Sequence, residues 1–397
     1  MKNITGTAAE GDDFFDREED LERFFHEFDN LANLLLIAPR RVGKTSFVIE
    51  LARRLRAQGT HAAFFNAEAC QHEVDFAERL IAALRQEGLR AEFPAQIESF
   101  FHKARQLLAG LKAGAGGIDV EVSDAADGSG TLGRIISSIL RQIDSPDQSL
   151  VIIIDELPEM LLTLVRGEGG AARVTHFLHW LRDMRQTYRQ RIRWVFLGSI
   201  GLDSFVDNRS LRKTINDLTT ISLGAYEPAV AHAFLQKLGD DNGLPLDLDV
   251  RRAIIDQLGW PLPYYLQLVF HELVQLGTKP VTPPDVDRAI EHLLSPAGYG
   301  YFDTWRQRLK EQFDPPDAAA ARTVLKLLCQ HPAGAARSRL LDELMNHPQP
   351  PDVVETEDRL ARVLETLQRD GYLLTADGRY AFRSFLLREY WHRREVR

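Results

Sequence analysis

A short segment of the chain carries the residue types that bind phosphate. Residues 38–45 read APRRVGKT, after an apolar run and before an amphipathic helical pattern. In a Walker A loop of this kind, backbone N–H groups and the helix N-terminus surround a phosphate, where their dipoles favour an anion. The predicted nucleotide-contacting residues of this segment are Ala38, Pro39, Arg40, Arg41, Val42, Gly43, Lys44, Thr45 and Ser46.

Within this loop, individual residues have distinct expected roles. Gly43 lets the backbone approach the phosphate, Lys44 reaches the β- and γ-oxygens and assists catalysis, and the Thr45 hydroxyl binds Mg²⁺. Ala38 stands where the pattern usually has its first glycine, and a methyl group is better tolerated there than at Gly43 because the position lies at the strand exit. The alternative is that the Gly-Lys-Thr tripeptide occurs here by chance. The predicted strand before it and the predicted helix after it argue against this alternative.

Two carboxylates follow a second apolar run, in the sequence LVIIIDELPEM at 150–160. Ligands bind at the carboxyl ends of strands in open parallel sheets. We expect Asp155 to hold Mg²⁺ through its water shell, and Glu156 to orient and deprotonate the attacking water, as in a Walker B segment. The alternative is that both residues only begin the next helix, as its cap and first-turn acid.

A third polar residue ends the apolar run RWVFLG at 193–198. If this strand lies between those that carry Lys44 and Asp155, the hydroxyl of Ser199 is placed to contact the γ-phosphate or to position water. We therefore count Ser199 as a catalytic candidate. A plain Gly-Ser turn is the alternative.

These residues need a scaffold that brings strand ends together. Short apolar runs at 31–37, 61–66, 150–154, 193–198 and 219–223 alternate with helical patterns, which predicts a parallel sheet covered on both faces. The stretch 44–58 predicts a helix that Gly59 ends. Beyond residue 225 only helical patterns continue to about 313, where a DPPD turn follows. In the last part, three helical patterns precede a predicted hairpin around 376–378 and a final helix.

Composition restricts the class of protein. The chain has 397 residues, 44% of them apolar, enough for two or three domains. A net charge of −9 argues against a protein that coats polyanions, so any nucleic-acid contact must be local. Two distant cysteines give neither a disulfide framework nor a thiolate zinc site. With no signal peptide and no long apolar stretch, we expect a cytoplasmic protein without membrane partners.

Several segments together resemble the STAND-type ATPases of prokaryotes, close to the archaeal-type ATPase family among the AAA+-related P-loop proteins. They are FFDREEDLERF, APRRVGKTS, LVIIIDELPEML, WVFLGSIGL and GWPLPYY, and the resemblance runs from about residue 12 to the end. It implies that Phe15 and Arg17 contact adenine, although Asp16 replaces the usual glycine of that segment. It also implies that Pro261, in Gly-Trp-Pro, reports the bound nucleotide to a lid. The alternative for the segment with Phe15 and Arg17 is an ordinary acidic start of a helix. The alternative for Gly-Trp-Pro is a turn between two helices.

The expected fold is therefore α/β, with a P-loop NTPase core of the AAA+/STAND type. Its parallel sheet occupies residues 1–224, a helical lid 225–313, and a winged helix-turn-helix 318–397. The expected ligands are ATP and Mg²⁺. The expected function is a regulatory switch that hydrolyses ATP and couples nucleotide state to duplex DNA or a protein through the winged helix. The alternatives are a nucleotide-gated DNA-binding module and a scaffold that forms homo-oligomers with ATP, each with little hydrolysis.

The partner of the C-terminal part stays open at the level of sequence. Between 371 and 397 the arginines outnumber the acids, with six at 379, 383, 388, 393, 394 and 397 against three at 377, 389 and 395. Such a local excess of cations could neutralise phosphates. A solvated helix face that docks on the lid explains the same residues equally well, because winged helices also serve protein contacts.

Overall fold

The computed structural model describes residues 1–87, 89, 131–143, 149–167, 169–198, 201–207, 209–346 and 352–396. These residues form two compact units. The sheet unit comprises Arg17–Ile37 and Phe47–Leu223, and the helical unit comprises Met1–Asp16, Ala38–Ser46 and Gly224–Arg397, within the described ranges. The loop at 38–46 is thus grouped with residues far away in sequence.

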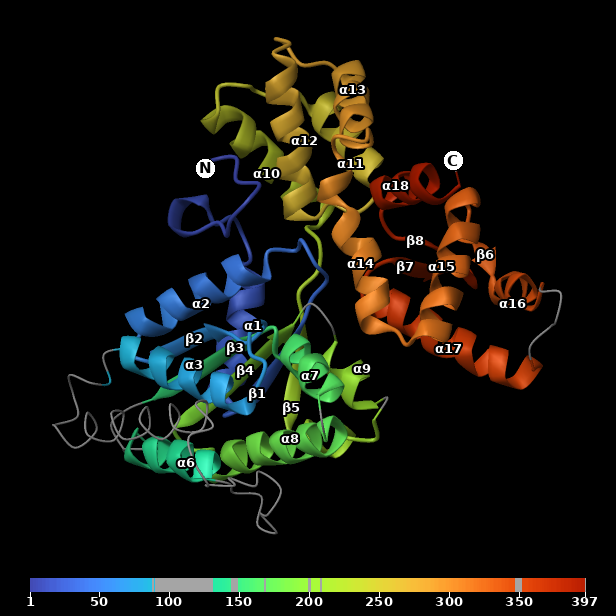
Figure 1. Cartoon of the computed structure of the whole chain (residues 1–397). Coiled ribbons are helices and arrows are strands. Elements are labelled where there is room, and N and C mark those ends of the chain that lie inside the picture. The colour runs from blue at the N-terminus through green and yellow to red at the C-terminus, as the bar shows by residue number, and fades with distance from the viewer. Residues whose placement is uncertain are drawn as a thin grey trace. The chain divides into compact units, whose positions relative to one another are not determined.

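The sheet unit is built on a 5-stranded parallel sheet in the order β2-β3-β4-β1-β5 (Figure 1). Every predicted strand forms within a residue or two of its expected bounds: β1 (Asn33–Ile37), β2 (His61–Asn66), β3 (Leu150–Asp155), β4 (Ile192–Gly198) and β5 (Leu218–Ser222). β3 and β4 are buried along their whole length. Their sequences are apolar except for Arg193 in β4 and Asp155 at the end of β3, which suits strands covered on both faces.

Helices complete the sheet unit. They are α1 (Glu18–Asp29), α2 (Lys44–Ala57, whose first residues belong to the helical unit), α3 (Glu73–Gln86), α6 (Thr131–Ile143), α7 (Leu157–Arg166), α8 (Gly170–Thr187) and α9 (Leu202–Asp207). A short 3₁₀ turn, η2, covers Arg212–Thr214. α6 runs along α8, where the Tyr188 hydroxyl donates to the Ser137 carbonyl at 2.7 Å (Figure 1). The predicted helix at 44–58 is confirmed, and Gly59 ends it with φ 81°.

Five helices lie between β5 and residue 313, where the periodic patterns predicted helices. They are α10 (Pro228–Asp241), α11 (Leu248–Leu258), α12 (Pro263–Leu276), α13 (Pro283–Leu293) and α14 (Asp303–Gln312), together with the 3₁₀ turns η1 (Gly11–Asp13) and η3 (Tyr299–Tyr301). Thr282 and Asp285 form a capping box that fixes the start of α13. Within the described ranges, no helix combines the length and apolar character needed to cross a membrane.

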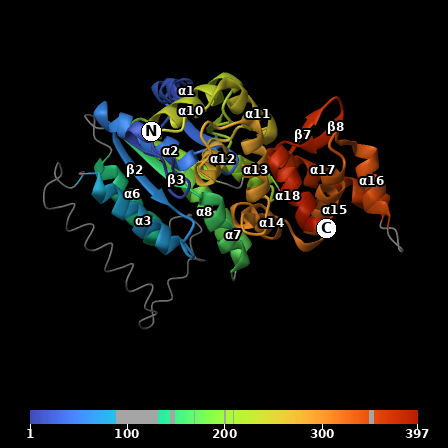
Figure 2. The same cartoon turned by 90° about the horizontal axis from the view of Figure 1, so that it is seen from above.

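The last part of the helical unit gathers four helices next to a 3-stranded sheet in the order β6-β8-β7 (Figure 2). The elements are α15 (Pro315–Gln330), β6 (Ala335–Ala336), α16 (Arg337–Met345), α17 (Val353–Arg369), β7 (Leu373–Ala376), β8 (Arg379–Phe382) and α18 (Phe385–Glu395). The predicted hairpin is confirmed. Asp377 and Gly378 both have positive φ, 51° and 72°, which matches the twist of a tight antiparallel connection.

Candidate functional site

The phosphate-loop candidate runs from Ala38 to Ser46 and leads into α2. Lys44 is only 8% exposed, and its Nζ donates weak hydrogen bonds to the carbonyls of Ala38 and Pro39, at 3.4 and 3.5 Å. The ammonium group is therefore held over its own loop. Thr45 is exposed at the first turn of α2, whereas the Ser46 hydroxyl accepts a hydrogen bond from the Ala9 N–H at 2.9 Å.

Backbone conformation explains the glycine of this loop. Gly43 has φ 92°, a value that side chains rarely allow, yet a Cβ placed there would meet no heavy atom within 4 Å. Conformation, not crowding, thus requires glycine, and space is left beside the backbone N–H groups. Ala38 is not among the residues with positive φ, which explains why a methyl group is tolerated at this position.

Arg41 contacts Tyr264 of helix α12 through both its side chain and its backbone. Its guanidinium carbon lies 4.1 Å from the centroid of the Tyr264 ring, and its carbonyl accepts the Tyr264 N–H at 3.4 Å. Arg41 also has φ 69°, so the loop turns sharply at this residue. A cation above an aromatic face at this distance is an attractive contact. The loop conformation is therefore tied to the packing of α12.

In the sheet unit, Asp155 and Glu156 lie at the carboxyl end of β3. Asp155 is 3% exposed, and its Oδ1 accepts the N–H of Glu156 at 2.9 Å. Glu156 occupies the N-cap position of α7 in a left-handed conformation, with φ 53° and ψ 34°, and makes no capping hydrogen bond through its side chain. Left-handed backbone costs a residue with a side chain roughly 1–2 kcal/mol. Backbone strain of this kind is found preferentially at functional sites.

Because the strands are parallel, the carboxyl ends of β1 and β3 lie at the same end of the sheet. All strands are parallel and β4 lies between β1 and β3. This is the arrangement on which the role expected of Ser199 depends. Ser199 itself, one residue beyond β4, lies outside the described residues. At the other end of β4 the Asn33 side chain accepts the Trp194 N–H at 2.9 Å.

The segment expected to contact adenine has unusual backbone geometry. Asp16 has φ 56° and Arg17 has φ 78°. Asp16 thus adopts the left-handed conformation that the glycine usual at this position would adopt freely, and aspartate tolerates it better than most residues. Arg17 is 8% exposed, and its Nη1 donates to Asp20 at 3.3 Å. The ring of Phe15 packs edge-on against Phe234.

Tyr226 joins two of the predicted segments and was missed by sequence reasoning. Its hydroxyl donates to the Phe15 carbonyl at 2.9 Å, and its N–H donates to the Pro261 carbonyl at 3.2 Å. It is 8% exposed, whereas Phe15 and Pro261 are half-buried. No local pattern around Tyr226 signals this, because its partners lie 211 and 35 residues away in sequence.

The Gly-Trp-Pro turn also contacts the C-terminal part of the helical unit. Gly371 has φ 85°, and a Cβ there would lie 2.5 Å from the Trp260 ring and 3.2 Å from Pro39. The Arg383 guanidinium lies 5.2 Å from the Trp260 ring centroid. The Ser384 hydroxyl donates to the Leu258 carbonyl at 3.3 Å. Loop, turn and C-terminal strands therefore share one packed interior within this unit.

An ion-pair network supports the helix that follows the loop. Glu50 on α2 is buried and accepts two hydrogen bonds from Arg53, at 2.7 and 2.8 Å, and one from Arg54 at 2.7 Å. Arg54 also binds Glu18 of α1. The Arg53 hydrogen bonds, helped by Arg54, lower the pKa of the Glu50 carboxyl against the opposing effect of its burial. The carboxylate thus stays ionised and holds Arg54, which in turn pairs with Glu18 of α1.

The candidate residues suit ATP and Mg²⁺ chemically. Mg²⁺ prefers oxygen ligands and keeps several waters beside phosphate oxygens, so one carboxylate and one hydroxyl from the protein are sufficient. Asp155 carries such a carboxylate in the sheet unit, and Thr45 carries such a hydroxyl in the helical unit. The described ranges contain no group of three or more histidine, cysteine, aspartate or glutamate side chains placed to hold a metal ion by themselves. Lys44 and the N-terminus of α2 supply the positive potential that a triphosphate requires.

No protein-family model and no curated protein matches the chain. Solved structures do match it over nearly its whole length. A Walker-type ATPase of Pyrococcus abyssi is 16% identical, with a TM-score of 0.62 over 99% of this chain and 100% of that one. The ORC2 protein of Aeropyrum pernix, in ADPNP–ADP complexes, is 11% identical, with a TM-score of 0.56 over 98% of each chain.

At these identities the likeness concerns the fold. The chain has the α/β fold of these two proteins, with a parallel sheet at its centre and many helices around and after it.

Proposed function

We propose that the chain binds ATP with Mg²⁺ and hydrolyses it, acting as a nucleotide-driven switch of the STAND type. The observation that carries this proposal is the loop itself: Lys44 is held over a loop with left-handed Gly43, directly before α2. The shared fold with a Walker-type ATPase and with a protein in ADPNP–ADP complexes supports a nucleotide as the ligand.

Each candidate residue has a chemical role in this proposal. Lys44 neutralises charge on the β- and γ-oxygens, and the N–H groups around Gly43 hold the β-phosphate. Thr45 and Asp155 hold Mg²⁺, which supplies further positive charge to the phosphate oxygens. Glu156 orients the attacking water and takes its proton. In the same proposal Ser199 contacts the γ-phosphate.

The proposal also covers the residues that contact adenine and the residue that responds to the bound nucleotide. Phe15 and Arg17 hold the adenine, and Pro261 responds to the bound nucleotide. Tyr226 supports this part, because it binds the carbonyls of both Phe15 and Pro261. A change at the adenine would therefore reach the turn between α11 and α12 through one residue, by its side-chain hydroxyl and its backbone N–H. The division into a core, a lid at 225–313 and a winged helix-turn-helix at 318–397 is part of the proposal.

The decisive experiment is steady-state ATP hydrolysis by the purified chain and three variants. Lys44→Ala should abolish binding or turnover, and Glu156→Gln should lower kcat by roughly 100-fold or more while ATP still binds. Glu159→Gln makes the same change three residues further along and should retain turnover. Hydrolysis by Lys44→Ala at the parental rate would refute the proposal. Tight binding without turnover, with elution as a larger species in a non-hydrolysable analogue, would favour the oligomerising scaffold.

For the C-terminal part, several contacts within the helical unit make duplex DNA the less favoured partner. Arg393 pairs with Glu291 on α13, and the Tyr390 hydroxyl donates to Asp303 at 2.6 Å. The guanidinium of Arg394 lies over the Tyr299 ring. These arginines are already engaged within the helical unit and would have to exchange partners to bind phosphates. Duplex DNA binding at low salt that weakens steeply as salt rises would reverse this preference.

A further inference from the structure

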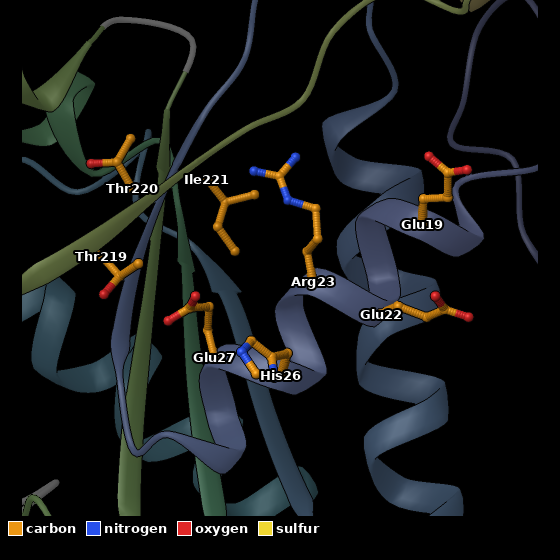
Figure 3. Close-up of a pocket in the computed structure, with 8 residues that line it drawn as sticks. All are labelled: Glu19, Glu22, Arg23, His26, Glu27, Thr219, Thr220 and Ile221. Atoms are coloured by element: carbon orange, nitrogen blue, oxygen red, sulfur yellow. The ribbon is translucent and has the colours of Figure 1, made fainter.

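A pocket of about 560 Å³ lies between α1 and β5 of the sheet unit (Figure 3). The side chains that extend from α1 toward β5 are those of Arg23 and Glu27, whose opposite charges cancel. The edge of β5 therefore favours a ligand of neither charge. In the loop at 38–46 of the helical unit, by contrast, the Arg41 guanidinium lies over an aromatic ring, that of Tyr264.

Two residues of this loop turn the backbone in the left-handed sense. They are Arg41, with φ 69°, and Gly43, with φ 92°, whereas Val42 between them is not among the residues with positive φ. Alternation of this kind turns successive N–H groups toward one side, where they form a concave site for an anion. A phosphate site in this loop therefore needs the left-handed conformation at Arg41 as well as at Gly43.

Arginine does not adopt this conformation by preference. Glycine reaches φ 69° freely, whereas a residue with a Cβ does so only at a cost in free energy. Arginine also lacks the short polar side chain that lets asparagine or aspartate offset this cost locally. Contacts elsewhere must therefore hold Arg41. Tyr264 supplies two of them, through its ring at 4.1 Å from the guanidinium carbon and through its N–H, which donates to the Arg41 carbonyl.

Tyr264 is held firmly enough to serve as a support. It is the second residue of α12, after Pro263, and its neighbour Tyr265 is fully buried. The Tyr265 hydroxyl accepts a hydrogen bond from Nε1 of Trp305 at 2.8 Å, which anchors this end of the helix. Burial raises the pKa of the Tyr264 hydroxyl, against the opposing effect of Arg41. A partly desolvated ring attracts a cation more strongly than an exposed ring does.

We propose that Tyr264 is a positioning residue of the nucleotide site. Its ring holds the Arg41 guanidinium, and this contact keeps the Arg41 backbone left-handed. The left-handed backbone in turn presents the N–H groups of the loop to the phosphates. In this role Tyr264 acts through Arg41 and not by touching the nucleotide. The inference rests on the proposed binding of ATP and adds to it a residue outside the loop.

Amide hydrogen exchange without nucleotide tests the positioning step. Tyr264→Leu should raise the exchange rate of a peptide that covers 38–46 by about fivefold, because the loop opens more often once the ring is lost. Tyr264→Phe keeps a ring and should restore the parental rate. Tyr299→Leu is the matched control, because it removes a ring that lies under a different arginine, Arg394. Exchange of the β3 peptide reports on global stability. An unchanged rate at 38–46 in Tyr264→Leu would overturn the proposal.

Titration calorimetry with ATP and Mg²⁺ tests the consequence for binding. Tyr264→Leu should weaken ATP binding by about fivefold, whereas Tyr264→Phe should stay within about twofold of the parent. In an Arg41→Gly background, adding Tyr264→Leu should change the affinity by less than about twofold, since glycine keeps φ 69° without help from the ring. The same loss with and without Arg41 would show that Tyr264 acts by another route, and would overturn the proposal.

A comparison of two substitutions at Arg41 separates positioning from direct contact with phosphate. Both Arg41→Gly and Arg41→Ala lose the guanidinium, but only alanine keeps a Cβ that resists the left-handed conformation. Arg41→Ala should therefore bind ATP at least about threefold more weakly than Arg41→Gly. Equal affinities of the two variants would mean that the guanidinium itself binds phosphate, which would overturn the proposal.

The same measurements distinguish failure of this inference from failure of the proposed function. Absence of ATP binding by the parent would refute ATP as the ligand and would overturn this inference with it. ATP binding by the parent, together with parental affinity in Tyr264→Leu, would overturn this inference alone.

Discussion

The hydroxyl of Tyr226 donates a hydrogen bond to the carbonyl oxygen of Phe15 at 2.9 Å, across 211 residues of sequence. The N–H of the same residue donates to Pro261. One residue thus fixes the N-terminal segment and the turn between α11 and α12 to each other.

Removing the Tyr226 hydroxyl should weaken ATP binding more than catalysis. A hydrogen bond of this kind contributes about 1 kcal/mol, so Tyr226→Phe should raise KM for ATP by roughly fivefold with kcat nearly unchanged. Tyr188→Phe is the matched control, because it also loses a hydroxyl bond to a backbone carbonyl, that of Ser137. Steady-state kinetics measure both. An unchanged KM in Tyr226→Phe would contradict the positioning role.

Gly371 should not tolerate even a methyl group. In Gly371→Ala the new Cβ would lie 2.5 Å from the Trp260 ring, and φ 85° adds backbone strain. Together these should cost about 2–5 kcal/mol of unfolding free energy. Gly378→Ala, at φ 72° with no atom within 4 Å, should cost only the strain of about 1–2 kcal/mol. Urea denaturation measures the unfolding free energy of both variants. Equal losses in the two would show that the Trp260 ring moves aside at little cost.

A buried ion pair should matter for stability in the C-terminal part. Arg308 is fully buried, and its Nε lies 3.7 Å from Oδ2 of the buried Asp370. Asp370→Asn leaves the guanidinium without this carboxylate, which should cost about 3–5 kcal/mol. The double variant Arg308→Met/Asp370→Asn should recover part of that loss. Denaturation gives the loss of unfolding free energy in each variant. If the loss in the double variant equals the sum of the losses in the two single variants, the two charges do not interact.

Acid should weaken the ion pairs that Glu50 makes with Arg53 and Arg54 on α2. The pKa of this carboxyl is lowered from its usual 4.5 in the folded state, mainly by hydrogen bonds from Arg53. The unfolded chain therefore binds this proton first, so the stabilisation is complete above pH 4.5 and is lost as pH falls through the lower folded-state value. Glu50→Gln should consequently lose more stability at pH 7 than at pH 3. Exposed Glu22→Gln serves as the control, and melting temperatures across this range measure the effect.

Local signals in the sequence were sufficient for most elements. All strands of the parallel sheet form where continuous apolar runs predicted them, and the Asp377-Gly378 turn forms the predicted hairpin, because these signals depend on neighbouring residues alone. The loop at 38–45 and the carboxylates at Asp155 and Glu156 were found for the same reason. Their chemical roles, and that of Ser199, stay predictions.

What the sequence did not reveal depends on long-range packing. The pairing of Tyr226 with Phe15, and of Arg308 with Asp370, joins residues that no spacing rule connects. The left-handed backbone of Glu156 was equally hidden, because glutamate has no preference for it and only the surrounding fold imposes it. The two-residue strand β6 is too short to leave a pattern.

The grouping of residues 38–46 with the helical unit bears on any attempt to divide the protein. The chain passes between its two units at four junctions, after residues 16, 37, 46 and 223. A fragment that stops at residue 223 would keep every strand of the parallel sheet and the whole loop sequence, but would lack Tyr264, on which Arg41 packs. No single cut in the chain yields a fragment that contains the parallel sheet and the loop with its packing partner but lacks the C-terminal half. The loop at 38–46 therefore depends for its packing on the C-terminal half of the chain.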